Sequence, residues 1–236
     1  MMERPRQAPK NERTLSRGRD GDGAMAEDPQ ALAGIVAPSP TAVSRLTAYV
    51  DLLKKWQSAK NLVSPGTLDV IWSRHVADSA QAQAALPEAR RWLDIGSGAG
   101  LPGLVTAILL ADMPGAHVDL VESNGRKAAF LRTVVRELGL PATIHAERIE
   151  SAAERLAESG RIEAVSARAL APLAGLLELA APVLRRGAVG VFHKGQDFAS
   201  ERAEATQSWG FDLVELQSKT DAGGRIVLLR NVVFKG

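Results

Sequence analysis

The feature that most constrains the fold is a regular alternation of short apolar runs with longer segments of helical periodicity, which begins at Arg91. The short runs have the composition of buried strands, and the longer segments repeat their apolar residues at helical spacing. The strand-like runs are RWLDI, AHVDLVE, TIHAE, EAVSARA and GAVGVFHK, and the helical segments are LVTAILLAD, GRKAAFLRTVVRELG, ESAAERLAE and APLAGLLELAAPVL. Repeated strand–helix units predict an α/β fold, with a parallel sheet covered by helices on both faces.

The carboxyl-terminal part departs from this alternation. After a helix-like stretch, DFASERAEATQSWG, two β-rich runs follow in succession, FDLVELQSKT and GRIVLLRNVVFK. Two strands without a helix between them predict an antiparallel hairpin at one edge. Five parallel runs and these two give a mostly parallel seven-stranded sheet.

The chain before Arg91 falls into two parts. Residues 1–38 are rich in Arg, Asp, Gly and Pro, and are expected to form a disordered leader because they have little to bury. Ser39 and Pro40 suit the N-cap and first position of a helix, and apolar residues then recur at helical spacing. We therefore expect an N-terminal helical segment over 39–90 and a sheet domain over 91–236.

Composition excludes several classes of protein. The chain has no cysteine, so it has neither disulfides nor thiolate metal sites, and this suits a reducing cytoplasm. No cluster of His, Asp and Glu has the spacing of metal ligands. No apolar run approaches the roughly 20 residues of a membrane span. The formal charge of +2 is small, so any basic surface must come from local clustering.

Three glycines, Gly96, Gly98 and Gly100, follow the first predicted strand directly. In a parallel α/β sheet this turn lies at the carboxyl edge, where ligands bind, and glycine lets a ligand approach the main chain. The nicotinamide fingerprint would need glycine at Leu101, and a phosphate-binding P-loop would need Lys at Leu104. The loop therefore predicts a ligand that does not depend on a bound phosphate.

Glu122 ends the second predicted strand, where an acid can accept hydrogen bonds from both hydroxyls of a ribose. A surface carboxylate at a strand end is an equal alternative for this residue alone. The glycine loop contains no Lys or Arg that would meet a pyrophosphate. A ribose-containing cofactor without phosphate fits both features, and S-adenosylmethionine is such a cofactor.

These motifs resemble those of the class I S-adenosylmethionine-dependent methyltransferases, which have a Rossmann-like fold. More narrowly, the chain resembles the bacterial glucose-inhibited division protein B family, whose members methylate N7 of a guanine in 16S rRNA. The matching segments are NLVS (61–64), RHVADS (74–79), DIGSGAGLPG (94–103), ESNGRKAAFLR (122–132), ERIE (147–150), SARAL (166–170) and FHKGQ (192–196). They run in order over residues 41–236.

The resemblance implies a set of cofactor contacts beyond the glycines. They are Gly96, Gly98, Gly100, Leu101, Glu122, Ile149, Glu150 and Arg168. Ile149 and Glu150 follow the third strand, where the adenine edge would lie and backbone contacts would suit it. Arg168 follows the fourth strand and would pair with the methionine carboxylate or with an RNA phosphate. A structural ion pair is the alternative for Arg168.

Basic residues suggest where RNA would bind. Arg126 and Lys127 fall in the first turn of a predicted helix, where cations forgo roughly 0.3–1 kcal/mol each, so a nearby anion is expected. Arg132 and Arg136 extend the basic surface along the same helix, and with Lys194 they form a candidate phosphate-contacting face. A solvated helix face explains Arg132 and Arg136 equally well.

His75 and Asp78 share one face of a predicted helix, at i and i+3. N7 of guanine carries no proton, so the reaction needs alignment and no general base. We therefore assign no acid or base, and expect His75 to position RNA or to support structure. His117 and His145 are expected to be core or edge residues.

Two other functions stay open at this stage. One is a class I methyltransferase that acts on another RNA, a protein or a small molecule, and the other is a non-catalytic RNA-binding module with this fold. The intact glycine loop, the basic helix start and HKGQ favour the rRNA methyltransferase. Its expected partner is 16S rRNA or the small ribosomal subunit. We expect a cytoplasmic monomer without metal or membrane contact.

Overall fold

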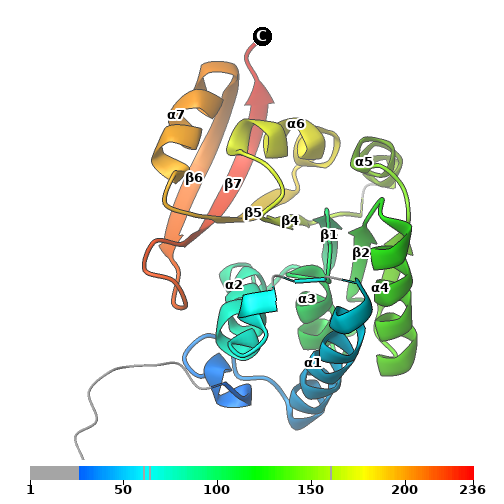
Figure 1. Ribbon diagram of the computed structural model, residues 1–236. Coiled ribbons are helices and arrows are strands. Elements are labelled where there is room, and N and C mark those ends of the chain that lie inside the picture. The colour runs from blue at the N-terminus through cyan, green and yellow to red at the C-terminus, as the bar shows by residue number, and fades with distance from the viewer. Residues whose placement is uncertain (1–26, 61, 64, 160) are drawn as a thin grey trace, which may run out of the picture.

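The computed structural model describes residues 27–60, 62–63, 65–159 and 161–236. The described chain is built around one twisted sheet with helices on both faces (Figure 1). The strands are β1 (Arg91–Ile95), β2 (His117–Val121), β3 (Ala142–His145), β4 (Ala164–Arg168), β5 (Val189–Lys194), β6 (Trp209–Gln217) and β7 (Arg225–Phe234). Their order across the sheet is β3-β2-β1-β4-β5-β7-β6.

The strand pairing confirms the predicted topology. β1 is parallel to both β2 and β4, β2 is parallel to β3, and β4 is parallel to β5. β7 runs antiparallel to β5 and to β6, which gives the predicted carboxyl-terminal hairpin. The chain direction across the sheet reverses between β1 and β4. At such a point loops diverge and leave a crevice at the carboxyl ends of the strands.

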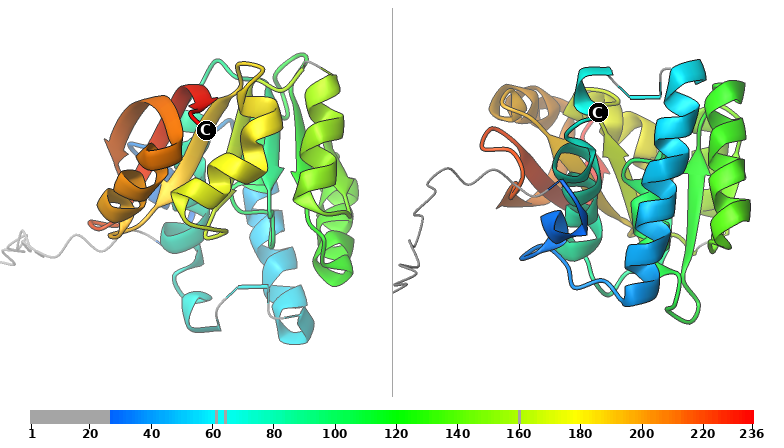
Figure 2. Two further views of the ribbon diagram at one scale, coloured as in Figure 1. Left: turned by 90° about the horizontal axis from the view of Figure 1, so that it is seen from above. Right: turned by 60° about the horizontal axis from the view of Figure 1, so that its bottom comes forward.

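Helices cover the two faces in separate layers (Figure 2). The elements are η1 (Pro29–Leu32), α1 (Pro40–Lys60), η2 (Pro65–Thr67), η3 (Trp72–Ala77), α2 (Asp78–Ala85), α3 (Gly103–Leu110), α4 (Gly125–Leu138), α5 (Ile149–Glu158), α6 (Leu173–Leu184) and α7 (Phe198–Ser208). Helices α1 to α4 pack on one face, and α5 to α7 pack on the other. Side chains of β1 alternate between the layers, so that Trp92 joins the first and Leu93 the second.

The amino-terminal part is more ordered than the sequence suggested. η1 is capped by the Asp28 carboxylate, which accepts a hydrogen bond from the Gln30 N–H at 2.7 Å. Leu32 is buried in the same cluster as the sheet, so the expected disordered leader over 1–38 is too long at its carboxyl-terminal end. Its part over 1–26 lies outside the described residues. The cause of the error is that the end of this range, ALAGIVAP over 31–38, is apolar, and Ala31 and Leu32 are buried in the core.

The predicted helix start at Ser39 is confirmed, because its Oγ accepts a hydrogen bond from the Ala42 N–H at 3.1 Å. Tyr49 and Leu53 of α1 are fully buried in one cluster with Trp92 of β1 and Phe130 of α4. The helical segment and the sheet therefore share a core. None of the helices in the described ranges combines the length and the apolar character needed to cross a membrane.

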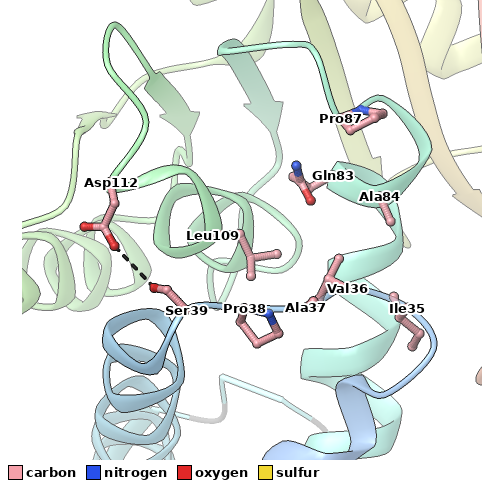
Figure 3. A pocket seen from close by; sticks show the side chains of 10 residues that line it. All are labelled: Ile35, Val36, Ala37, Pro38, Ser39, Gln83, Ala84, Pro87, Leu109 and Asp112. Carbon is pink, nitrogen blue, oxygen red and sulfur yellow. Dashed lines mark hydrogen bonds between the residues drawn. The ribbon is translucent and has the colours of Figure 1, made fainter.

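One hollow lies away from the carboxyl edge of the sheet (Figure 3). It has a volume of about 380 Å³ and lies between the segment that precedes α1 and the ends of α2 and α3. At its rim, the Ser39 hydroxyl donates to the Asp112 carboxylate at 3.3 Å. Pro87, which precedes β1, lines it and places it at the amino edge of the sheet.

Candidate active site

The glycines of the loop after β1 serve different purposes. A Cβ on Gly96 would lie 2.7 Å from the Leu170 side chain, and one on Gly100 would lie 2.3 Å from Leu104. These two positions are therefore needed for packing. A Cβ on Gly98 would have only the Gly96 carbonyl oxygen within 4 Å, at 3.8 Å, so Gly98 faces open space. Its φ of +56° still disfavours any other residue.

Tyr49 of α1 supports this loop through a hydrogen bond that its place in an apolar helical stripe did not predict. Its hydroxyl donates to the Ala99 carbonyl at 2.8 Å, and the whole side chain is buried. Burial raises the pKa of Tyr49, so the hydroxyl stays a donor. The available signal was that this is the only tyrosine in the chain and it lies in a buried helical stripe, where a hydroxyl must find a partner.

Glu122 joins the glycine loop to the start of α4. Its Oε2 accepts a hydrogen bond from the Gly98 N–H at 2.9 Å, and its Oε1 accepts one from the Asn124 N–H at 2.7 Å. An ionised carboxylate has about four lone-pair positions, so two stay open to a ligand. The carboxylate is nearly buried, at 8% exposed. It is a structural part of the loop as well as the predicted ribose acceptor.

Asp94 lies at the end of β1 under the same loop and is 1% exposed. Its Oδ1 accepts a hydrogen bond from the Ser166 hydroxyl at 2.7 Å, while Oδ2 is buried against the backbone of Gly103 without a well-aligned donor. Burial is the main cause that raises the pKa of Asp94 to about 6, and the nearby charge of Glu122 adds to it. A Cβ at Gly103 would lie 2.5 Å from Oδ2, which explains the glycine of the GLPG extension.

Arg168 was expected to meet the methionine carboxylate or RNA, but the structure shows it in an internal network. Its Nε lies 3.0 Å from the Asp78 carboxylate, and its guanidinium donates to the Arg74 carbonyl at 2.9 Å. Asp78 also accepts from the Thr220 hydroxyl at 2.9 Å. The alternative of a structural ion pair is therefore present. The pair ties the helical segment to the ends of β4 and of the β6–β7 hairpin.

His75 is 9% exposed and both of its ring nitrogens have partners. Nδ1 accepts from the Arg168 guanidinium at 3.2 Å, because arginine can only donate. Nε2 therefore carries the proton and donates to the Thr67 hydroxyl at 2.7 Å. Burial and the Arg168 charge lower the pKa of His75 to about 4. The imidazole is neutral and poorly suited to take up a proton.

Two clefts lie side by side along the carboxyl edge of the sheet. The loop cleft, of about 630 Å³, is lined by Gly96, Ser97, Gly98, Leu101 and Lys127. The β5 cleft, of about 610 Å³, is lined by Lys194, Glu201, Thr220, Asp221 and Arg225. Both are also lined by His75, Arg168 and Ala169, which we call the shared wall. Two ligands could therefore meet at this wall.

Ala169 of the shared wall has a φ of +51°. A left-handed conformation costs a non-glycine residue roughly 1–2 kcal/mol, and such strain is found more often at functional sites than elsewhere. Ala169 follows β4 directly, at the switch between the two directions of the sheet. The strain therefore lies where the two clefts join.

The predicted basic residues of α4 differ in position. Lys127 lines the loop cleft, whereas Arg126, Arg132 and Arg136 are exposed. The Asn124 side chain caps the helix by accepting from the Arg126 and Lys127 N–H groups at 3.0 and 3.2 Å. The Arg136 guanidinium lies 3.8 Å from the carboxylate of the neighbouring Glu137, and both side chains are exposed to solvent.

Lys194 does not lie with these residues. Its side chain is 6% exposed, forms an ion pair with Glu201 and donates to the Ala171 carbonyl at 3.1 Å. Lys194 therefore lies apart from α4, because β1 and β4 separate β5 from β2, which α4 follows. The contact of Lys194 with RNA stays a prediction. The partner of Lys194, Glu201, was not among the site residues predicted from the sequence.

Ile149 and Glu150 begin α5, directly after the loop that follows β3. The Ile149 side chain packs on the second core layer, and Glu150 pairs with Arg148 at 3.2 Å on the surface. Neither side chain lines the loop cleft, so the predicted adenine contact would have to be made by their backbone. β3 is the neighbour of β2, which places them near Glu122. His145 and His117 lie on strands, as expected, and His145 contacts Asp119 at 2.7 Å.

The sheet order, the glycine loop after β1 and the carboxylate after β2 define a class I methyltransferase. Solved structures share this fold. The O-methyltransferase TomG from Streptomyces achromogenes, solved in complex with S-adenosylmethionine, has a TM-score of 0.53 and is 14% identical over 83% of this chain and 92% of that chain. The O-methyltransferase from Bacillus cereus has a TM-score of 0.51 and is 14% identical over 84% of this chain and 94% of that chain.

The chain belongs to the GidB family, rRNA small subunit methyltransferase G, which it matches over residues 42–227. The ribosomal RNA small subunit methyltransferase G of Methylorubrum populi is 50% identical over 190 residues, which are 78% of this chain and 89% of the relative. The protein of the same name from Nitrobacter hamburgensis is 46% identical over 207 residues, 88% of this chain and 79% of the relative. The resemblance stated from the motifs is confirmed.

Proposed function

We propose that this methyltransferase uses S-adenosylmethionine to methylate N7 of a guanine in 16S rRNA of the small ribosomal subunit. The observation that carries the proposal is the pair of clefts that meet at the shared wall. One cleft has the loop of a ribose-containing cofactor, and the other is lined by donors and acceptors that suit a nucleotide. Family membership supports rRNA as the substrate.

The residues of the loop cleft fit the cofactor. Gly98 faces open space, where an added side chain would enter the cleft. Glu122 has lone pairs left for the ribose hydroxyls, and Leu101 offers an apolar wall. Lys127 lines the same cleft and is assigned to the carboxylate of the methionine moiety, because Arg168 is already paired with Asp78. When bound, the cofactor supplies an electrophilic sulfonium methyl group.

The protein's part in the reaction is alignment and exclusion of water. N7 of guanine has an in-plane lone pair and no proton, so no side chain has to act as a base. The neutral state of His75 agrees with this. Both of its ring nitrogens are hydrogen-bonded and its pKa is about 4, so the imidazole keeps neighbouring residues in position and does not take up a proton. Tyr49, Asp78 and Arg168 fix the loop and the shared wall in place.

Contact with the rRNA backbone is assigned to the exposed cations of α4. These are Arg126, Arg132 and Arg136, which are exposed on the helix that carries Lys127. Lysine and arginine neutralise phosphates and release counterions, which supplies much of the affinity for nucleic acid. Lys194 is assigned to positioning of the target base in the β5 cleft. The enzyme would act in the cytoplasm, as a monomer, on the subunit or an assembly intermediate.

The test is to map 7-methylguanine in 16S rRNA from a strain that lacks the gene. We expect one modified guanine to lose its methyl group, and purified protein with S-adenosylmethionine to restore it on the unmethylated subunit. A deletion strain with unchanged 16S methylation would reject the proposal. Methylation of another RNA, a protein or a small molecule instead would favour a different methyltransferase of the same class.

A further inference from the structure

Methylation at N7 does not by itself select guanine. Adenine also presents an N7 lone pair, so the two purines differ at O6 or N6 and along the Watson–Crick edge. Guanine places the O6 acceptor next to the N1–H donor, and adenine places the N6 amine donor next to the N1 acceptor. An enzyme of the proposed function therefore needs a donor and an acceptor, side by side, in the cleft that takes the base.

The β5 cleft contains such a pair in Lys194 and Glu201. The Lys194 ammonium has three N–H groups, of which two are used, for Glu201 and for the Ala171 carbonyl. The Glu201 Oε2 takes the ammonium and the Leu173 N–H, the latter at 2.8 Å. No described residue donates to Glu201 Oε1. One donor and one acceptor oxygen are thus available.

The fold places this pair at a suitable distance from the shared wall. Arg168 of β4 and His193 of β5 are partners in the parallel register, so Ala169 and Lys194 follow at corresponding positions of neighbouring strands. Neighbouring strands lie roughly 4.8 Å apart, which is the scale of a single base. A purine with N7 at the shared wall would present O6 or N6, and N1 beside it, to Lys194 and Glu201.

The pair is also held rigidly. The Lys194 side chain is 6% exposed and the Glu201 side chain 20% exposed, and the bonds to Ala171 and Leu173 fix both against the backbone. A preorganised site of this kind rejects a ligand with the wrong hydrogen-bond pattern strongly, because buried polar groups are then left unpaired.

We infer that Lys194 and Glu201 select guanine over adenine, with Lys194 donating to O6 and Glu201 accepting from N1–H. The inference rests on the proposed function, and it assigns Lys194 a base-reading role in place of a phosphate contact. With adenine, the N6 amine donor would face the Lys194 donor, and the N1 acceptor would face the Glu201 acceptor.

The first experiment uses the parent protein and changes only the base. Unmethylated small subunits carry guanine, inosine, 2,6-diaminopurine or adenine at the position that the mapping identifies, and single-turnover methyl transfer is measured. Inosine keeps O6 and N1–H, so it should react within about tenfold of guanine. Diaminopurine keeps N7 and the N2 amine but reverses the other two groups, so it should be slower by about 100-fold, like adenine. Diaminopurine that reacts as guanine does would overturn the inference.

The second experiment changes the acceptor. Glu201→Gln should slow methylation of guanine by about 10- to 100-fold and lower the guanine-to-adenine ratio, with unchanged binding of S-adenosylmethionine. Glu204→Gln, an exposed carboxylate on the same helix, is the matched control and should leave both unchanged. Equal slowing on both bases would show a structural ion pair only. If the parent methylates none of the four subunits, the proposed function fails, whatever the variants do.

Discussion

At Gly98 the backbone N–H donates to Glu122, while the space beside its Cα is open to the loop cleft. A valine side chain at this position would therefore not clash with other residues of the protein. It would instead occupy the space that the cofactor is expected to fill. We expect Gly98→Val to weaken binding of S-adenosylmethionine by at least about 100-fold in titration calorimetry. The backbone strain at a φ of +56° adds roughly 1–2 kcal/mol of destabilisation.

Gly115 supplies the matched control for this strain. It has a φ of +78° with nothing within 4 Å, in the loop before β2 at the amino edge of the sheet. Gly115→Val should lower the melting temperature to a similar extent and leave cofactor affinity unchanged. If Gly98→Val binds the cofactor as tightly as the parent, the loop after β1 is only a turn.

Asp94 gives a prediction about pH. Burial raises its pKa from 3.8 to about 6, so between these values the folded protein holds more protons than the unfolded chain. The free energy of unfolding should therefore fall as pH rises from about 4 to about 6, by up to about 3 kcal/mol from this group. Asp94→Asn removes the titrating group, so the difference in unfolding free energy between variant and parent should shift in favour of the variant as pH rises from about 4 to about 6.

Urea denaturation at several pH values measures this difference. Asp51→Asn, an exposed carboxylate on α1, is the control and should track the parent at every pH. A constant difference between Asp94→Asn and the parent from about pH 4 to about pH 7 would contradict the assignment of the raised pKa.

At the scale of elements, sequence patterns predicted the strands, the parallel part of the sheet and the carboxyl-terminal antiparallel hairpin. The alternation of β1 residues between two core layers, and the apolar stripe of α4, are local properties that a sequence displays directly. The position of Glu122 beside the glycine loop could also be predicted, because neighbouring parallel strands end at the same edge of the sheet. The π-helical turn η3 could not be predicted, because its sequence, WSRHVA, does not differ from that of an ordinary α-helix.

Side-chain contacts between different elements were missed for a common reason. Lys194 on β5 and Glu201 on α7 are linked by a turn whose direction no local pattern fixes. Tyr49 reaches Ala99 across 50 positions in the chain. Lys194, a basic residue at a strand end, was therefore interpreted as a phosphate contact, although the Glu201 carboxylate is its partner in the fold.

Helix α4 carries a prediction of its own. Its arginines Arg126, Arg132 and Arg136 are exposed, and its first turn contains cations without an acidic residue. Replacing Arg132 and Arg136 by alanine should weaken binding of 16S rRNA and flatten the log–log salt dependence by up to about one unit per lost phosphate contact. Cofactor affinity should stay the same, since neither side chain lines the loop cleft.

Filter binding at a series of salt concentrations measures both quantities. Arg161→Ala, an exposed arginine before β4 at the opposite edge of the sheet, controls for a general loss of charge. Equal affinity and equal salt slope in the α4 variants and the parent would show that these arginines are a solvated helix face.

At the scale of the whole molecule, the site is assembled from parts far apart in the sequence. Arg74 and Asp78 come from the helical segment, Arg168 from β4 and Thr220 from the end of the β6–β7 hairpin. Asp78 accepts from both Arg168 and Thr220, so one carboxylate fixes the shared wall between the clefts. The helical segment is thus part of the site, although it precedes the glycine loop.

The pH dependence of the reaction tests this assembly as a whole. With both nitrogens of His75 bonded and its pKa lowered to about 4, the single-turnover rate should be nearly flat from about pH 6 to about pH 8. His75→Ala should weaken RNA binding or stability, yet keep the rate at saturating RNA within about tenfold, far from the 10²–10⁴-fold loss of a general base.

His117→Ala, on β2 away from both clefts, is the control. A rate that rises near pH 6 to 7 in the parent, and loses that rise in His75→Ala, would identify His75 as a base. The methylated atom would then be one that carries a proton, and the assignment to N7 would have to be given up.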